Sequence, residues 1–352
     1  MNYKLLILRS KLFRYYKYYS EIKKTNIFLA KYYSFLSSDE LAKVKKKYRQ
    51  SWIKYQMGTA DFFRLHCEDK SMLDISKYLP YRESALFCRE VNSIKAQNLL
   101  NNKYECYKHF SAYYGRRVEI ISLHDIDTGL GLAKLKKIAG NRLNQSCIIK
   151  PLNMNCGQGV KVMCSFPDIL NYVKEIGGGI VEELIIQDES LAAFNESSVN
   201  TLRIHTANFG NGIIDVLWPC LRIGRAGSVV DNAGAGGVFS AIDVTTGMTT
   251  AAIDESRNVW KVHPDSKKEL IGFTIPKWQD AVLLAKELAQ KIPNAGFVAW
   301  DLALTKNGWV MVEGNSSPLI IYQIAIGKGI RNEFNIMKNK FVKNRKYAEK
   351  CN

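Results

Sequence analysis

Two stretches of alternating apolar residues, joined by a tight turn, lie near the end of the sequence in residues 297–315. The turn reads Lys-Asn-Gly at 306–308, which is the pattern of a β-hairpin. This hairpin carries three oxygen-bearing side chains, Asp301, Glu313 and Asn315, the last two on one strand face. Carboxylate and amide oxygens suit Mg²⁺ bound together with nucleotide phosphates. Acids that keep a solvated edge strand soluble are the alternative.

A lysine followed by glycines forms a second candidate site. The apolar run 146–149 ends in Lys150, and Gly157 and Gly159 follow in the next loop. The lysine supplies positive charge for a phosphate, and glycines let backbone N–H groups approach an oxyanion. The segment has neither the Walker pattern nor the dinucleotide-binding pattern, and two glycines alone are also typical of plain turns.

An apolar strand interrupted by acids follows at residues 179–189. Such a strand offers backbone groups and a carboxylate to the edge of an adenine and to a ribose. Paired glutamates that simply face solvent are the alternative for this segment.

In chain order, these segments resemble the ATP-grasp superfamily over residues 95–335. The shared features are a lysine that opens a helix (Lys103), Lys150 with its glycine loop, a Val-Glu-Glu segment and the final Asp…Glu-x-Asn set. Within the superfamily, the chain is most similar to the sugar-transfer-associated proteins found with bacterial surface-polysaccharide genes. The stretches that indicate this subgroup are 197–204, 221–224, 230–237 and 313–318, followed by Gln323.

The resemblance implies an ATP site between two α+β lobes, with Mg²⁺ bridging the phosphates. Lys103 and Lys150 would hold the α- and β-phosphates, and the loop from Gly157 to Gly159 would cover the phosphate tail. The metal would be held by Asp301, Glu313 and Asn315. At the nucleoside end, the implied contacts are Glu182 and the Glu183–Leu184 backbone at adenine, and Glu189 or Asp188 at the ribose.

The resemblance also implies groups that stabilise the transferred phosphoryl group and a substrate carboxylate. These are Arg222 and Asn232 with the 234–237 backbone, since a planar guanidinium matches both anions. Ala299 stands where D-alanine ligases place an arginine, so the positive charge must come from Arg222 or Arg203. A structural ion pair is the alternative role for Arg203.

The reaction implied is ATP-dependent ligation of a carboxylate to an amine or related nucleophile through an acylphosphate. The expected substrate is sugar- or amino-acid-derived, and the expected setting is capsule, O-antigen or exopolysaccharide biosynthesis. The alternative is a nucleotide-binding accessory protein of a glycosyltransferase system without ligase turnover. The intact metal-ligand set favours catalysis.

The sequence predicts an α+β fold with an N-terminal helical region at 1–90 and an ATP-grasp domain at 91–345. Within this domain we expect a first subdomain (91–145), an ATP-clasping lobe (146–190) and a C-terminal lobe with the metal site (191–345). Local patterns predict a helix start at Ser37–Glu40, one helix over 93–114 and another over 276–292.

The net charge of +17 is confined to the two ends of the chain. Residues 1–60 have 11 surplus basic groups and nine of the 18 tyrosines, and residues 328–352 have a surplus of 6. Basic and aromatic side chains suit peripheral contact with an anionic membrane surface. A packed layer of amphipathic helices is the alternative. Nucleic acid is disfavoured because the motif-bearing middle of the chain is neutral.

The remaining composition indicates a cytoplasmic protein with reduced cysteines. The eight cysteines include no Cys-x-x-Cys pair, so neither zinc nor a disulfide framework is expected. No apolar run approaches the roughly 18–20 residues of a membrane span. The five histidines form no site, and only His205 has a position from which to face the cleft.

Overall fold

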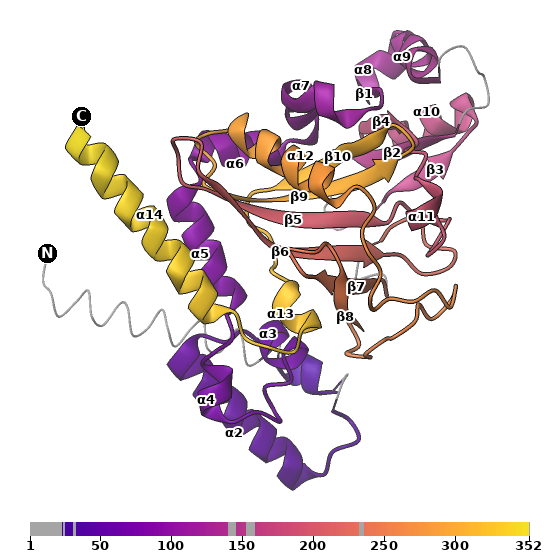
Figure 1. Cartoon of the computed structure of the whole chain (residues 1–352). Helices are drawn as coiled ribbons and strands as arrows, with labels where there is room; N and C mark the ends of the chain where they lie inside the picture. Colours follow the sequence, from indigo (N-terminus) through magenta and orange to yellow (C-terminus); the bar gives the residue numbers. More distant parts are fainter. Residues whose placement is uncertain are drawn as a thin grey trace, which may run out of the picture. The chain divides into compact units, whose positions relative to one another are not determined.

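The computed structural model describes residues 23, 25–30, 33–139, 146–152, 159–231 and 236–351 (Figure 1). These residues divide into two compact units. Unit 1 contains the chain up to Leu86 together with Gly327–Ile336, and unit 2 contains Phe87–Ile326 together with the chain from Met337 onward.

Unit 1 is helical. It contains α2 (Ser38–Tyr55), α3 (Thr59–Arg64), α4 (Met72–Ile75) and the first part of α5 (Tyr81–Val91). The predicted helix start is confirmed, because Ser37 and Glu40 form a reciprocal capping box at the beginning of α2. No helix in the described part of the chain is long and apolar enough to span a membrane.

Unit 2 mixes helices and antiparallel strands, which confirms the predicted α+β class. Its helices are α6 (Ile94–Asn101), α7 (Lys103–Tyr114), α8 (Leu123–Asp127), α9 (Leu130–Ala139), α10 (Phe166–Glu175), α11 (Glu189–Ala192), α12 (Trp278–Gln290), α13 (Tyr322–Ala325) and most of α14 (Arg331–Cys351). Its strands are β1 (Val118–Ile121), β2 (Cys147–Pro151), β3 (Lys161–Met163), β4 (Gly179–Glu183), β5 (Thr201–Asn208), β6 (Ile214–Ile223), β7 (Val238–Ile242), β8 (Thr249–Asp254), β9 (Phe297–Thr305) and β10 (Gly308–Asn315).

The strands form two antiparallel sheets. The small sheet has the order β1-β4-β2-β3, and the large sheet has the order β10-β9-β5-β6-β7-β8. The predicted hairpin is confirmed as β9 and β10, with Gly308 opposite Thr305 at the turn. A bulge between Met311 and Glu313 shifts the register of β10 before its last residues.

The two faces of the large sheet differ in chemistry. Helices α6, α7 and α12 pack with one face of this sheet in a common hydrophobic core, to which β5 contributes Leu202 and Ile204. Because side chains alternate along a strand, the intervening Arg203 projects from the opposite face. Asp301 lies directly opposite Arg203 on the neighbouring strand β9, so the opposite face carries the charged groups.

The segment predicted as one helix over 93–114 forms two helices, α6 and α7, so the prediction of an unbroken helix is wrong. The Asn102 side chain accepts hydrogen bonds from the backbone N–H groups of Tyr104 and Glu105, at 3.1 Å each, and thereby starts α7. The break puts Lys103 at the first position of α7, where the sequence predicted that a lysine opens a helix.

Gly115 ends α7 in a left-handed conformation with φ +57°, and a Cβ there would lie 2.6 Å from Val310 Cγ1. We predict that Gly115→Ala lowers stability by about 2–3 kcal/mol, because it combines backbone strain with overpacking. The matched control is Gly129→Ala, which has φ +76° but no atom within 4 Å and so isolates the backbone cost of about 1 kcal/mol. Thermal unfolding checks this, and equal shifts for the two variants would contradict the role of Val310.

Candidate functional site

Asp301 forms the centre of a buried ion-pair cluster on the large sheet. Asp301 is 1% exposed, and its carboxylate accepts two hydrogen bonds from Arg203, Nε to Oδ1 and Nη2 to Oδ2, both at 2.7 Å. Arg222 of β6 adds a third bond, Nη1 to Oδ2 at 2.8 Å. Burial alone would raise the pKa of Asp301, but the two arginines outweigh it and lower the pKa to about 2.

Arg222 is shared with a second acid, Asp231, which our sequence reasoning did not single out. Arg222 Nη2 lies 3.0 Å from Asp231 Oδ1. The other oxygen of Asp231 accepts from the backbone N–H of Thr201 at 3.1 Å and from the Thr201 hydroxyl. The only sequence signal for this role was the presence of Asp231 within the 230–237 motif. The contacts hold the guanidinium of Arg222 in a fixed position.

Glu313 and Asn315 lie beside Asp301 on the edge strand β10. Glu313 is opposite Asp301, and Asn315 Nδ2 donates to Glu313 Oε1 at 3.3 Å. Burial and the neighbouring charge of Asp301 raise the pKa of Glu313. The two carboxylates repel each other when both are ionised. Together with the amide oxygen of Asn315 they form an all-oxygen donor set that suits Mg²⁺.

The arginine contacts leave capacity on Asp301 for a metal. A carboxylate offers about four lone-pair positions, and Arg203 and Arg222 occupy three of them, while the fourth lies towards Glu313, whose proton a metal would replace. A divalent cation would also stabilise the ionised form of Glu313. The residues present therefore fit the predicted Mg²⁺ site.

Glu182 forms the centre of a second buried ion-pair cluster, on β4 of the small sheet. Lys150 Nζ lies 2.8 Å from its Oε1, and Arg116 Nε lies 2.8 Å from its Oε2. Burial opposes ionisation, but these two cations outweigh it and lower the pKa of Glu182 to about 2. The structure thus places the Glu182 carboxylate on two cations within the protein.

Arg116 is the residue of this cluster that our sequence reasoning missed. It is buried, and its guanidinium also donates to the carbonyl oxygens of Tyr114 at 3.1 Å and of Met311 at 2.8 Å. The signal was the Arg-Arg pair just before β1. The two side chains point to different surroundings: Arg116 is buried against Glu182, and Arg117 contacts Glu183 with half of its side chain exposed.

Lys103 experiences the charges of both clusters. Its pKa is lowered by burial and then by the positive charge of Lys150, while Glu313 and Glu182 act in the opposite direction. Two lysines whose charges repel each other are stabilised when an anion binds between them. The arrangement is suited to a polyanion such as a triphosphate.

The segment predicted to contact adenine is anchored by Glu183. Its carboxylate accepts from the Arg117 backbone N–H at 2.9 Å and from Arg117 Nη2 at 2.5 Å. Leu184 follows directly after β4 and is half-buried. The backbone at Glu183–Leu184 therefore leaves the small sheet at a fixed place.

The two candidates for the ribose contact differ in their surroundings. Asp188 caps α11, where its Oδ1 accepts from the backbone N–H of Ser190 at 3.1 Å and from the Ser190 hydroxyl at 2.5 Å. Glu189, the next residue along the chain, is exposed.

In the glycine loop, the Gly159 carbonyl accepts a hydrogen bond from the Tyr172 hydroxyl at 2.7 Å. Gly157 and Asn232 lie outside the described residues.

His205 lies in the protein core, so the expectation that it could face the cleft is wrong. Its ring is fully buried, stacks on Phe297 at 5.7 Å, and has Nδ1 3.2 Å from the Trp218 carbonyl oxygen. Burial lowers the pKa of His205 to about 3, with a further contribution from Arg203. The imidazole is therefore neutral at physiological pH.

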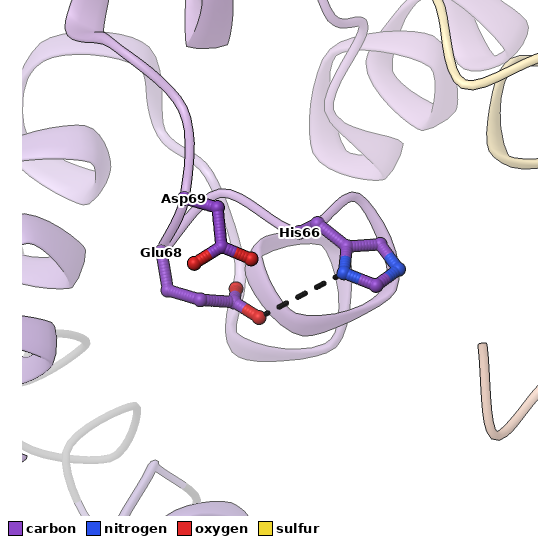
Figure 2. Close-up of side chains that lie close together, drawn as sticks. All are labelled: His66, Glu68 and Asp69. Carbon is purple, nitrogen blue, oxygen red and sulfur yellow. Dashed lines mark ion pairs between the residues drawn. The ribbon is translucent and has the colours of Figure 1, made fainter.

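A separate polar cluster lies in unit 1, on the turn after α3 (Figure 2). One ligand atom each from His66, Glu68 and Asp69 lies within 4.8 Å of the others, and His66 Nδ1 is 4.0 Å from Glu68 Oε1. The ammonium of Lys47 donates to the Glu68 carbonyl at 2.6 Å, so a positive charge already lies beside the cluster. Burial raises the pKa of the intervening Cys67 thiol, which keeps it protonated. We assign no site to this cluster.

The low pKa of Glu182 predicts a specific acid sensitivity. The pKa falls from 4.5 to about 2 on folding, so this carboxylate stabilises the fold above pH 4.5 and loses that contribution as pH falls towards 2. Glu182→Gln should therefore give a shallower loss of unfolding free energy between pH 5 and about 3 than the wild type. Urea titrations at several pH values check this, with the exposed Glu196→Gln as control. Parallel pH curves for Glu182→Gln and the wild type would contradict it.

Comparison with known protein families finds a match to part of the chain. Residues 168–339 match the family model described as Sugar-transfer associated ATP-grasp. This segment includes Arg203, Arg222 and the predicted metal ligands, and it begins after Lys103, Arg116 and Lys150. No curated protein matches the sequence.

Solved structures with low sequence identity resemble the fold. The D-alanine-D-alanine ligase from Coxiella burnetii is 11% identical, with a TM-score of 0.44, over 73% of this chain and 62% of the ligase. The L-amino acid ligase from Bacillus licheniformis is 13% identical, with a TM-score of 0.41, over 64% of this chain and 44% of that enzyme. N5-carboxyaminoimidazole synthetase from Staphylococcus aureus is 13% identical, with a TM-score of 0.40, over 69% of this chain and 52% of that enzyme.

This chain thus spans about 62% of the length of the first of these ligases. The family match covers the segment that contains Asp301, Glu313 and Asn315. Residues 168–339 therefore match the sugar-transfer-associated ATP-grasp family, which the sequence motifs resemble.

Proposed function

We propose that this protein is an ATP- and Mg²⁺-dependent ligase that joins a carboxylate to an amine or related nucleophile. The observation that carries the proposal is that Lys103 is partly buried and lies close enough to Lys150, Glu182 and Glu313 for the charges of all three to act on it. Cations for a polyphosphate and oxygen donors for a metal are thus neighbours within unit 2. Phosphoryl transfer needs this combination of charge neutralisation and positioning more than it needs a nucleophilic side chain.

The bound metal would neutralise phosphate charge, and Asp301, Glu313 and Asn315 would hold it. Lys103 and Lys150 bind the phosphates, and the loop containing Gly157 and Gly159 covers them. At the nucleoside end, the Glu183–Leu184 backbone contacts adenine. Glu189 binds the ribose, because the carboxylate of Asp188 is used to cap α11.

The arginines on the charged face bind the reacting carboxylate and phosphoryl group. A guanidinium has five N–H donors, and Arg222 uses Nη1 for Asp301 and Nη2 for Asp231. The remaining donors of Arg222 are available to phosphoryl and carboxylate oxygens, and we assign Asn232 to the same oxygens from the sequence motif alone. Arg203 holds Asp301 through Nε and Nη2 and fixes the strand that carries it.

In the first step, an oxygen of the substrate carboxylate attacks the γ-phosphorus of ATP, and ADP leaves. The nucleophile then attacks the acyl carbon of the acylphosphate, phosphate leaves, and the nucleophile loses a proton. We propose a sugar- or amino-acid-derived carboxylate, used in capsule, O-antigen or exopolysaccharide assembly. The alternative, a nucleotide-binding accessory protein of glycosyltransferases, predicts ATP binding without turnover.

Phosphate release separates these two functions. Purified protein with ATP and Mg²⁺ is assayed against panels of uronic acids, amino acids and nucleotide-sugars. We predict carboxylate-dependent phosphate release that falls at least a hundredfold in Glu313→Gln, because this variant loses a charged metal ligand. Glu175→Gln, an exposed carboxylate change on α10, is the matched control. Unchanged turnover in Glu313→Gln would remove this residue from the site.

We also propose that unit 1 contacts an anionic membrane surface. Residues 41–55 of α2 contain no acid, and the exposed basic residues of this stretch are Lys43, Lys45, Lys46, Arg49 and Lys54. Each basic residue near an anionic leaflet contributes about 1 kcal/mol. Ile53, which is 62% exposed, adds an apolar side chain to the same helix.

Charge reversal on α2 tests this contact. The double variant Lys43→Glu/Lys46→Glu should bind anionic vesicles at least tenfold more weakly at low salt than the wild type, because reversing two charges lowers the surface charge of α2 by four units. Lys136→Glu/Lys174→Glu makes the same charge change at exposed positions of unit 2 and is the control. Sedimentation with anionic and neutral vesicles is the measurement. Equal loss of vesicle binding in both variants, or no binding by the wild type, would contradict a membrane contact and indicate that α2 only packs on the protein.

A further inference from the structure

The carboxylate of Glu182 has cations on both of its oxygens. Lys150 Nζ and Arg116 Nε each lie 2.8 Å from it, one on Oε1 and the other on Oε2. The Glu182 side chain is 6% exposed, and that of Arg116 is 3% exposed. If Arg116 were absent, Lys150 and Glu182 would form a neutral pair. With Arg116 present, the three groups together keep one positive charge.

Arg116 is also held in place by two backbone carbonyls and an aromatic ring, so its guanidinium cannot turn towards a ligand. Its Nη1 donates to the backbone carbonyls of Tyr114 at 3.1 Å and Met311 at 2.8 Å, and its guanidinium lies 4.5 Å from the centre of the Tyr114 ring. Lys150, by contrast, is the more exposed of the two cations, with 18% of its side chain accessible. Any positive charge offered to a ligand is therefore offered through Lys150.

We propose that Glu182 is an internal counter-ion of the site, and that Arg116 is the positioning residue that keeps the charge of Lys150 available to ATP phosphates. This inference rests on the proposed function and assigns Glu182 a role other than the adenine contact that the sequence suggested. Arg116 itself contacts no substrate. It acts by neutralising Glu182 of β4 and by linking that carboxylate to β10 through its bond to the Met311 carbonyl.

The charge balance makes a quantitative prediction for nucleotide affinity. A unit charge about 10 Å from a phosphate, at an effective dielectric constant of about 20, changes affinity roughly tenfold. Arg116→Met removes the surplus charge and should weaken ATP binding about tenfold. Glu182→Gln removes the counter-ion and should raise affinity by up to about tenfold. The double variant Arg116→Met/Glu182→Gln restores the original charge and should return to within about threefold of the wild type.

Isothermal titration with ATP and with inorganic tripolyphosphate, both with Mg²⁺, tests this assignment. A charge effect appears with both ligands, whereas an adenine contact through Glu182 affects only ATP. Arg116→Lys keeps the charge but loses the forked contacts, and its affinity should stay within about threefold of the wild type. Circular dichroism verifies that each variant is folded. If Arg116→Met does not fold, Glu182→Gln and Arg116→Lys still test the assignment, because both keep a cation at position 116.

The outcomes separate this inference from the proposed function. Wild-type protein that binds neither ATP nor tripolyphosphate would overturn both. Wild-type binding with no weakening in folded Arg116→Met, no recovery in the double variant, or a loss confined to ATP in Glu182→Gln would overturn the role of Arg116 alone. Recovery of affinity for both ligands in the double variant would support it, provided that the circular dichroism spectrum of Arg116→Met matches that of the wild type, which excludes loss of structure as the cause of its weaker binding.

Discussion

The ion pairing of the buried Asp301 carboxylate is the interaction on which the charged face of the large sheet depends. Two arginines from neighbouring strands hold both oxygens of this carboxylate. Removing one partner of a buried pair leaves an uncompensated charge and typically costs about 3–5 kcal/mol. The positions of Arg203 and Arg222 are therefore set by the same contacts that keep Asp301 ionised, and Glu313 follows because it lies opposite Asp301 in the hairpin.

The small sheet also contains a buried, ionised carboxylate, and different cations neutralise it. Glu182 is buried and ionised because Lys150 and Arg116 neutralise it. Arg116 also bonds to the carbonyl of Met311, next to the bulge that precedes Glu313. The two clusters are thus joined through one guanidinium, which links the proposed phosphate-binding lysine to the proposed metal-binding strand. ATP and its metal would bind to groups that are already held in place.

Short-range features of this fold were predictable from the sequence. The β9–β10 hairpin depends on one turn and on alternation within 19 residues, and the start of α2 depends on a capping box. The break at Asn102 was missed because the helical pattern continues on both sides, and a single side-chain cap decides it.

The candidate site was predictable in its residue types but not in its pairing. Lys150, Glu182, Asp301 and Glu313 were visible in the sequence as unusual charged groups on apolar strands. The role of Arg116 was not, because its contact with Glu182 spans 66 positions and exists only once β1 pairs with β4. Sequence periodicity fixes which face a residue occupies, but the order of strands decides which charges meet.

Calorimetric titration of ATP in the presence of Mg²⁺, with wild-type protein and Lys150→Ala, tests the central claim most directly. The account predicts millimolar-or-better binding that requires Mg²⁺ and is lost in Lys150→Ala. The exposed Lys174→Ala on α10 should bind as the wild type does. Absence of ATP binding by the wild type, or equal affinity in Lys150→Ala and the wild type, would contradict it.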